Sequence, residues 1–188
     1  MMSFNSKIGS QINEAIKIGK KLAELNLVEG TSGNISFRHN DIIVITKSGT
    51  NLAELTHESF LRLRFGEKSE LASRDLPIHE KIYKRTPYNA VVHCHGVYNV
   101  VLSFLLDKID PMDLEGKIYL KEINVVEGEF GSPELVNKIV KEIAKKKVVV
   151  VRGHGIYSAA KNLKEAFNLA CYLEHSSKII YLFLLLRR

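Results

Sequence analysis

The chain has 188 residues, 45% hydrophobic and 26% charged, with a formal net charge of +6, which suits one domain with a full core over residues 1–188. Its basic residues are spread out and lack the aromatic partners of a nucleic-acid-binding sheet. We therefore interpret the charge as solvated surface that favours anionic substrates, and we expect no nucleic-acid partner. The two cysteines show no disulfide framework, and the sequence shows no signal peptide. The longest uncharged run near the end, residues 179–186, is far shorter than the ~20 residues of a membrane span. We therefore expect a cytoplasmic protein with no membrane partner.

Hydrophobic periodicity alternates between helical and strand spacing along the chain. In chain order it predicts a helix over residues 6–26, strands over 35–38 and 42–46, a short helix capped by Thr56, a strand over 61–65, a helix over 77–85, a strand over 90–95, a helix over 97–106, a strand over 123–126, a helix over 133–147, strands over 148–151 and 156–158, and a helix over 163–185. Residues 107–121 give no clear pattern. This order predicts one α/β domain with a largely antiparallel or mixed sheet. Apolar surface left over at residues 182–186 predicts an oligomer.

Three histidines stand at the ends of predicted buried strands. His93 and His95 are two residues apart, so a strand projects both from the same face. His154 follows the run of valines at 148–151 and lies between two glycines, which let backbone and substrate come close. A single buried histidine is more often a hydrogen-bonded core residue than a ligand. Three histidines from two strands, however, leave coordination positions open, as in catalytic zinc sites.

The other histidines and Asp75 have simpler interpretations. His39, His57 and His175 lie in polar contexts typical of the surface. His79 follows Asp75 by one helical turn and either orients that carboxylate or caps local structure. Asp75 itself precedes a Pro-containing first turn, so the sequence alone favours a helix N-cap over a metal ligand or a base.

Two loops rich in small residues, residues 30–34 and 47–50, have ordinary turn chemistry. They also offer what a phosphate group needs, namely free backbone N–H groups, hydroxyl groups and the cation of Lys47. Ser73 and Arg74 are candidates to join such a site. The sequence leaves both interpretations of these loops open.

Five segments, in this order, resemble the class II aldolase/adducin family: residues 30–34 (GTSGN), 45–49 (ITKSG), 72–75 (ASRD), 91–95 (VVHCH) and 153–155 (GHG). The family members that act on L-fuculose 1-phosphate are the ones most resembled. The resemblance implies a catalytic Zn²⁺ on His93, His95 and His154, with another divalent metal as the alternative. It also implies an α/β/α fold whose mostly antiparallel sheet lies between helices, and a homotetramer with active sites between subunits. The residues implied to hold the substrate phosphate are Gly33, Asn34, Ser48, Gly49 and Ser73, with Arg74 as a further anion-binding candidate.

The activity implied by this resemblance is zinc-dependent cleavage of a phosphorylated sugar, a ketose 1-phosphate such as L-fuculose 1-phosphate. The products are dihydroxyacetone phosphate and a short aldehyde such as L-lactaldehyde. The metal holds the resulting charge as an enediolate, and Asp75 exchanges the proton at C3.

Some features depart from the aldolase pattern. Asp75 stands where these aldolases carry glutamate, and residues 75–79 (DLPIH) resemble the family's 4-epimerases. The aldolase tyrosines have no clear counterparts, and Met112 falls near one of their positions. A 4-epimerase acting on L-ribulose 5-phosphate and another sugar-phosphate lyase of the family, such as a dehydratase or decarboxylase, are therefore the alternatives. A non-catalytic domain like the adducin head is the alternative outside enzymes, and it would not require three histidines in a common geometry.

Overall fold

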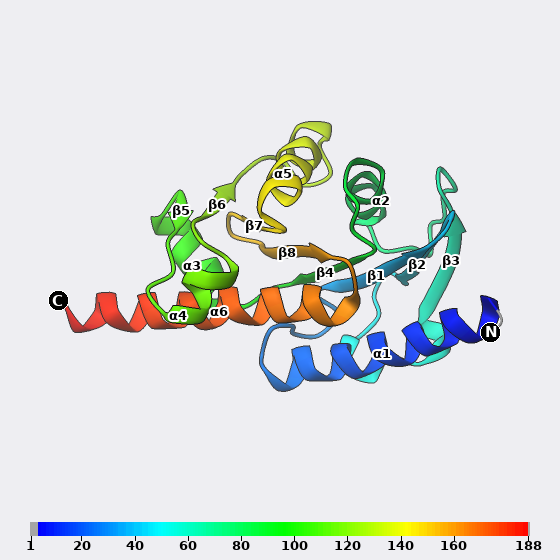
Figure 1. The fold of residues 1–188 in the computed structure, drawn as a ribbon, viewed down its shortest axis with the longest axis horizontal. Coiled ribbons are helices and arrows are strands. Elements are labelled where there is room, and N and C mark those ends of the chain that lie inside the picture. Colours follow the sequence, from blue (N-terminus) through cyan, green and yellow to red (C-terminus); the bar gives the residue numbers. More distant parts are fainter. Residues whose placement is uncertain (1–3, 188) are drawn as a thin grey trace.

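The computed structural model describes residues 4–187, which form one eight-stranded sheet with helices on both faces (Figure 1). The strand order is β3-β2-β1-β4-β8-β7-β6-β5. The helices are α1 (Phe4–Glu24), α2 (Leu76–Arg85), α3 (Val97–Leu105), α4 (Leu114–Tyr119), α5 (Pro133–Lys146) and α6 (Leu163–Leu186). The strands are β1 (Asn34–His39), β2 (Ile42–Thr46), β3 (Phe60–Arg64), β4 (Ala90–Cys94), β5 (Lys108–Ile109), β6 (Ile123–Val126), β7 (Val148–Val151) and β8 (Gly155–Ala160).

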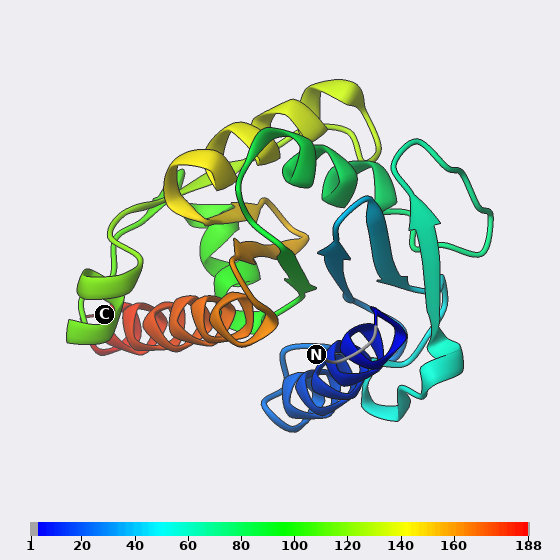
Figure 2. The same cartoon turned by 45° about the vertical axis from the view of Figure 1, so that its right-hand side comes forward.

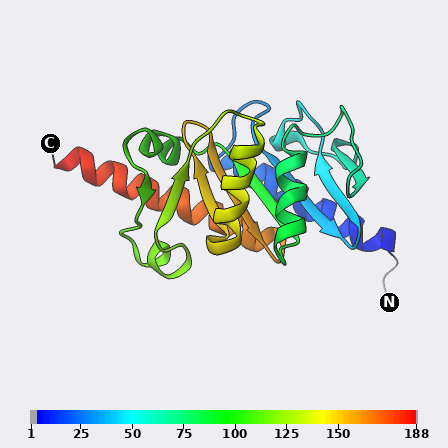
Figure 3. The same cartoon turned by 90° about the horizontal axis from the view of Figure 1, so that it is seen from above.

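The sheet separates two hydrophobic clusters, so the fold has the three layers expected of an α/β/α protein. Helices α1 and α6 pack on one face, while α2 and α5 cover the other (Figures 1 and 2). In β4 the side chains alternate between the clusters, with Val92 and Cys94 toward α1 and α6 and Val91 toward α2 and α5. Seen from above, α2 and α5 lie across the middle of the sheet (Figure 3). The α/β class predicted from the sequence is confirmed.

The sheet is mostly antiparallel, and its single parallel pair within residues 4–187 has a simple cause. Helix α5 connects β6 to β7 as a crossover, which brings these two strands together in the same direction. Residues 107–121, which gave no clear pattern, form the two-residue strand β5 and the short helix α4. The short helix expected after Thr56 is a 3-10 turn, His57–Ser59, in which Thr56 N donates to Ser59 Oγ at 3.0 Å. Strand β8 is longer than the predicted 156–158 because it pairs with both β4 and β7.

Helix α6 is long and apolar enough, by length and composition, to cross a membrane, and a third of its most apolar window is buried in the protein. Leu163, Leu173 and Ile180 pack in the core beneath the sheet, so the first part of α6 serves as a core helix. Its last turns extend past the rest of the molecule (Figures 1 and 3). There Leu182, Leu184 and Leu186 are exposed. These exposed leucines belong to the apolar segment, residues 182–186, from which we predict an oligomer.

Gly155 begins β8 directly after His154, with a φ of +147°. A β-carbon there would lie 2.3 Å from the carbonyl oxygen of Cys94 in the neighbouring strand. We expect Gly155→Ala to lower the free energy of unfolding by about 1–3 kcal/mol. Alanine would be strained at this backbone angle, and its β-carbon would push the two strands apart. Gly9→Ala is the matched control: Gly9 lies in α1 with open space around it, and alanine should raise stability by roughly 0.5–1 kcal/mol. Urea denaturation measures both, and equal shifts in the two variants would contradict this interpretation of Gly155.

Candidate active site

His93 lies at the centre of a row of side chains that crosses three strands. In the register of the sheet it is opposite Asn34 in β1 and opposite Tyr157 in β8. Its ring is 1% exposed and stacks on the ring of Tyr157 at 3.9 Å between centroids. Its Nδ1 donates to the carbonyl oxygen of Ile156 at 2.8 Å, so the ring's lone pair is on Nε2.

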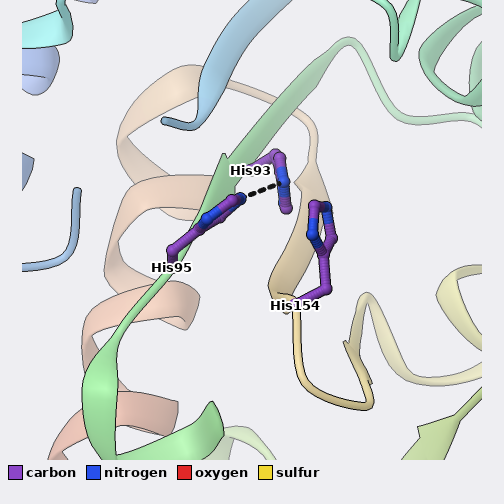
Figure 4. A group of neighbouring side chains, drawn as sticks. All are labelled: His93, His95 and His154. Carbon is purple, nitrogen blue, oxygen red and sulfur yellow. Dashed lines mark hydrogen bonds between the residues drawn. The ribbon is translucent and has the colours of Figure 1, made fainter. Parts of the chain in front are cut away.

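His95 and His154 complete a compact group around His93 (Figure 4). His95 follows β4, and its backbone N–H donates to the carbonyl oxygen of Leu27 at 2.7 Å. His154 comes from the turn between β7 and β8. The Nε2 atoms of His93 and His95 are 2.8 Å apart, and one ligand nitrogen from each of the three rings lies within 4.8 Å of the others.

The environment keeps these imidazoles neutral. Burial lowers the pKa of His93 well below its usual value and lowers that of His95 to about 4. Burial also lowers the pKa of His154. Neutral imidazole is the form that binds a metal ion. Around Zn²⁺ with bonds of about 2.0–2.1 Å, tetrahedral ligand nitrogens are roughly 3.3 Å apart, so the spacing and protonation of this group fit a divalent cation.

Asp75 is not a hydrogen-bonding N-cap, which corrects the interpretation that its sequence context favoured. It precedes α2 with φ −82° and ψ 0°, and its side chain makes no capping hydrogen bond. Instead Oδ2 accepts from Asn34 Nδ2 at 2.7 Å and lies 3.7 Å from His93 Nε2. Burial acts to raise the pKa of this carboxyl group, but His93, His79 and Asn34 together hold the pKa below its usual value. A buried carboxylate therefore faces the histidine group.

The two small-residue loops and the segment before α2 meet beside this carboxylate. Ser48 N donates to the carbonyl oxygen of Leu71, and Ser73 N donates to that of Thr46. A cavity of about 390 Å³ results, lined by Thr31, Ser32, Gly33, Asn34, Lys47, Ser48, Gly49, Ser73, Arg74, Asp75, His93, His95, Phe130 and His154. All the residues expected to bind metal or phosphate thus border one space. A larger cavity, about 530 Å³, lies near Tyr88 and Lys147 and contains none of them.

His79 is fully buried, and burial lowers its pKa to about 4. Its ring Nδ1 shares a 2.7 Å hydrogen bond with Ser36 Oγ rather than with Asp75. Its hydrogen bond with Asp75 is between main chains, from its N–H to the carbonyl oxygen of Asp75 at 3.1 Å. Of the three histidines expected at the surface, His57 and His175 are exposed and His39 is partly exposed.

Two residues of the site were missed from the sequence. Tyr157 lies beside His93 because β4 and β8 pair with these two residues opposite each other. Aligning the two predicted strands as an antiparallel pair could have pointed to Tyr157. Phe130 comes from the loop before α5, is 51% exposed, and its ring lies 5.5 Å from that of His154. Nothing in its Gly-rich surroundings distinguishes it in the sequence.

Comparisons with known proteins place the chain among aldolase-type proteins. The family model for the class II aldolase and adducin N-terminal domain matches residues 13–181. An L-fuculose phosphate aldolase of Methanocaldococcus jannaschii is 30% identical over 177 residues, covering 92% of this chain and 97% of that protein. The crystal structure of L-fuculose-1-phosphate aldolase from Thermus thermophilus has a TM-score of 0.90 at 32% identity, covering 95% of this chain and 96% of that one. A methylthioribulose-1-phosphate dehydratase of Pseudoalteromonas translucida is 26% identical, covering 87% of this chain and 90% of that protein.

The match to the family model extends over most of the chain and includes every residue that borders the histidine group. The fold agrees as well, since a class II aldolase superposes on nearly the whole structure. The chain belongs to the class II aldolase and adducin family, and its relatives identify it as a metal-dependent aldolase-type lyase.

Proposed function

We propose that this protein cleaves L-fuculose 1-phosphate, or a closely similar ketose 1-phosphate, to dihydroxyacetone phosphate and L-lactaldehyde or another short aldehyde. The observation that carries the proposal is a single cavity in which the three histidines and a buried carboxylate adjoin loops rich in backbone N–H and hydroxyl groups. Relatives named as L-fuculose phosphate aldolases support the choice of substrate. We further propose that it acts in the cytoplasm as a homotetramer.

In this proposal His93, His95 and His154 hold Zn²⁺. When bound, the cation supplies Lewis-acid stabilisation of the negative charge that develops as the C3–C4 bond breaks. The hydrogen bond from His93 Nδ1 to Ile156 fixes that ring with its Nε2 toward the other histidines. His93 lies in β4, His95 directly follows it, and His154 lies in the β7–β8 turn, so their positions depend on the sheet register.

Asp75 transfers the proton at C3 in this proposal. During cleavage the C4 hydroxyl group releases its proton as C4 becomes the aldehyde carbon, and the electron pair of the C3–C4 bond stays with the three-carbon fragment. Asp75 takes up a proton and transfers it to C3, which completes dihydroxyacetone phosphate with no net change in protons. In the reverse direction the carboxylate removes that proton. Its buried position beside His93, fixed by Asn34, suits this role. The chemistry needs no lysine Schiff base, so Lys47 is assigned no nucleophilic role.

The phosphate group is placed against Gly33, Asn34, Ser48, Gly49 and Ser73, with Arg74 at the rim of the cavity. We expect Arg74→Ala to raise the KM for the phosphorylated sugar roughly 3- to 10-fold with little change in kcat, because an exposed guanidinium contributes mainly to binding. Arg85→Ala, at the exposed end of α2, is the matched control and should leave KM unchanged. Steady-state kinetics distinguishes them, and an unchanged KM in Arg74→Ala would remove this residue from the phosphate site.

Two related reactions have specific support. The sequence of residues 75–79 favours a 4-epimerase, which breaks the same kind of bond and re-forms it on the other face of the aldehyde. The dehydratase relative favours loss of water from a ketose 1-phosphate.

Incubation with two substrates separates these activities. The purified protein is given L-fuculose 1-phosphate, with dihydroxyacetone phosphate followed with and without a chelator, and L-ribulose 5-phosphate in a parallel reaction. We expect release that stops with the chelator and resumes when Zn²⁺ is added. Conversion of L-ribulose 5-phosphate to xylulose 5-phosphate would favour the epimerase, and a product lighter by one water would favour the dehydratase. Release that a chelator leaves untouched would contradict the metal-dependent mechanism.

A further inference from the structure

Tyr157 is buried in the wall of the site, against two of its histidines. The residue is 1% exposed, and its ring lies nearly parallel to that of His93, with an angle of 10° between them. Its hydroxyl oxygen is 3.4 Å from Nε2 of His154. The same hydroxyl group and the carboxylate of Asp75 are close enough that each shifts the pKa of the other. Tyr157 therefore lies where the candidate base meets the histidine group.

The hydroxyl group has one proton and two acceptors near it. A phenol with its ordinary pKa of about 10 keeps its proton at neutral pH and acts as a donor. One acceptor is Nε2 of neutral His154, at a distance that is long for a hydrogen bond. The other is Asp75, whose buried Oδ1 accepts no hydrogen bond from any of residues 4–187. A nitrogen that binds a cation can no longer accept a proton, and the phenol is then left with the carboxylate.

We propose that Tyr157 is a positioning residue that couples cation binding at His154 to the placement of Asp75. Once the lone pair of His154 is occupied, the hydroxyl group of Tyr157 donates to Asp75 and fixes the carboxylate for proton transfer at C3. The stacked ring meanwhile keeps His93 in place. This inference rests on the proposed function, because it takes Asp75 as the group that moves the proton.

The test is Tyr157→Phe, which keeps the stacked ring and removes only the hydroxyl group. We expect kcat to fall about 10- to 100-fold, as for the loss of a hydrogen bond to a charged group, with KM within about twofold of the parent. Exchange of the C3 proton of dihydroxyacetone phosphate in D₂O should fall in parallel. Zn²⁺ affinity, measured by calorimetry on the metal-free protein, should be unchanged or tighter, because a competitor for the His154 lone pair is gone. Tyr88→Phe removes a partly buried hydroxyl group in the loop before β4, away from the site, and should change none of these quantities.

A structural role for Tyr157 gives a different result. Weaker Zn²⁺ binding together with a lower melting temperature, or an unchanged kcat, would overturn the inference. The double variant Asp75→Asn/Tyr157→Phe adds a second criterion, since a residue that acts through Asp75 loses its effect once the carboxylate is gone. Additive losses would also overturn it. If Asp75→Asn alone retains full activity, it is the role assigned to Asp75 in the proposed function that fails.

Discussion

Replacing His93 with alanine is expected to abolish both stoichiometric metal binding and aldolase activity. His93 is the buried member of the histidine group, and its Nε2 faces both His95 and Asp75. Without it only two imidazoles remain, which are too few for a stable catalytic site. The charge that develops during bond cleavage then loses its stabilisation, and activity should fall by at least about 10³-fold.

The measurements for His93→Ala are metal content by mass spectrometry and release of dihydroxyacetone phosphate. His175→Ala is the matched control, because His175 is an exposed histidine on α6 that does not border the cavity. Circular dichroism checks that both variants fold. Retention of one tightly bound metal ion by His93→Ala would contradict the ligand assignment.

Asp75→Asn is expected to separate metal binding from proton transfer. Asparagine has the same shape, and its side-chain oxygen can still accept the hydrogen bond from Asn34, so the site should stay intact and keep its metal. The amide cannot exchange a proton. We therefore expect kcat to fall about 10²- to 10⁴-fold, the usual contribution of a general acid or base.

Exchange of the C3 proton of dihydroxyacetone phosphate in D₂O, followed by NMR, reports this step without the aldehyde. It should slow in Asp75→Asn by about as much as the full reaction. Asp41→Asn, in the exposed turn between β1 and β2, is the control and should exchange like the parent. Loss of the metal from Asp75→Asn would instead make Asp75 a ligand.

Local patterns made most of the fold predictable. Strand alternation in residues 90–95 placed His93 and His95 on one side of the chain, and the valine run at 148–151 placed His154 at a strand end. The structure brings all three together, because β4 and β7 both pair with β8 and their carboxyl ends meet at one edge. Residues 107–121 stayed unassigned because a two-residue strand and a six-residue helix are too short to show a period.

Contacts that depend on register or on distant chain segments were not predictable in this way. Asp75 has the sequence context of an N-cap. The pairing of β1 with β4 places Asn34 beside His93, and Asn34 holds the Asp75 side chain in the site by a hydrogen bond. Tyr157 required the register of β4 against β8. Phe130 reaches His154 from a loop without periodicity. Each of these contacts joins segments that lie far apart in the chain, where local patterns carry no information about the partner.

Anomalous diffraction from crystals grown with Zn²⁺ and inorganic phosphate would locate both ions in the proposed site. We expect one zinc peak about 2.0–2.1 Å from a nitrogen of each of His93, His95 and His154, with phosphate among Asn34, Ser48 and Ser73 in the same cavity. A zinc peak elsewhere, or one that leaves out His154, would contradict the proposed site.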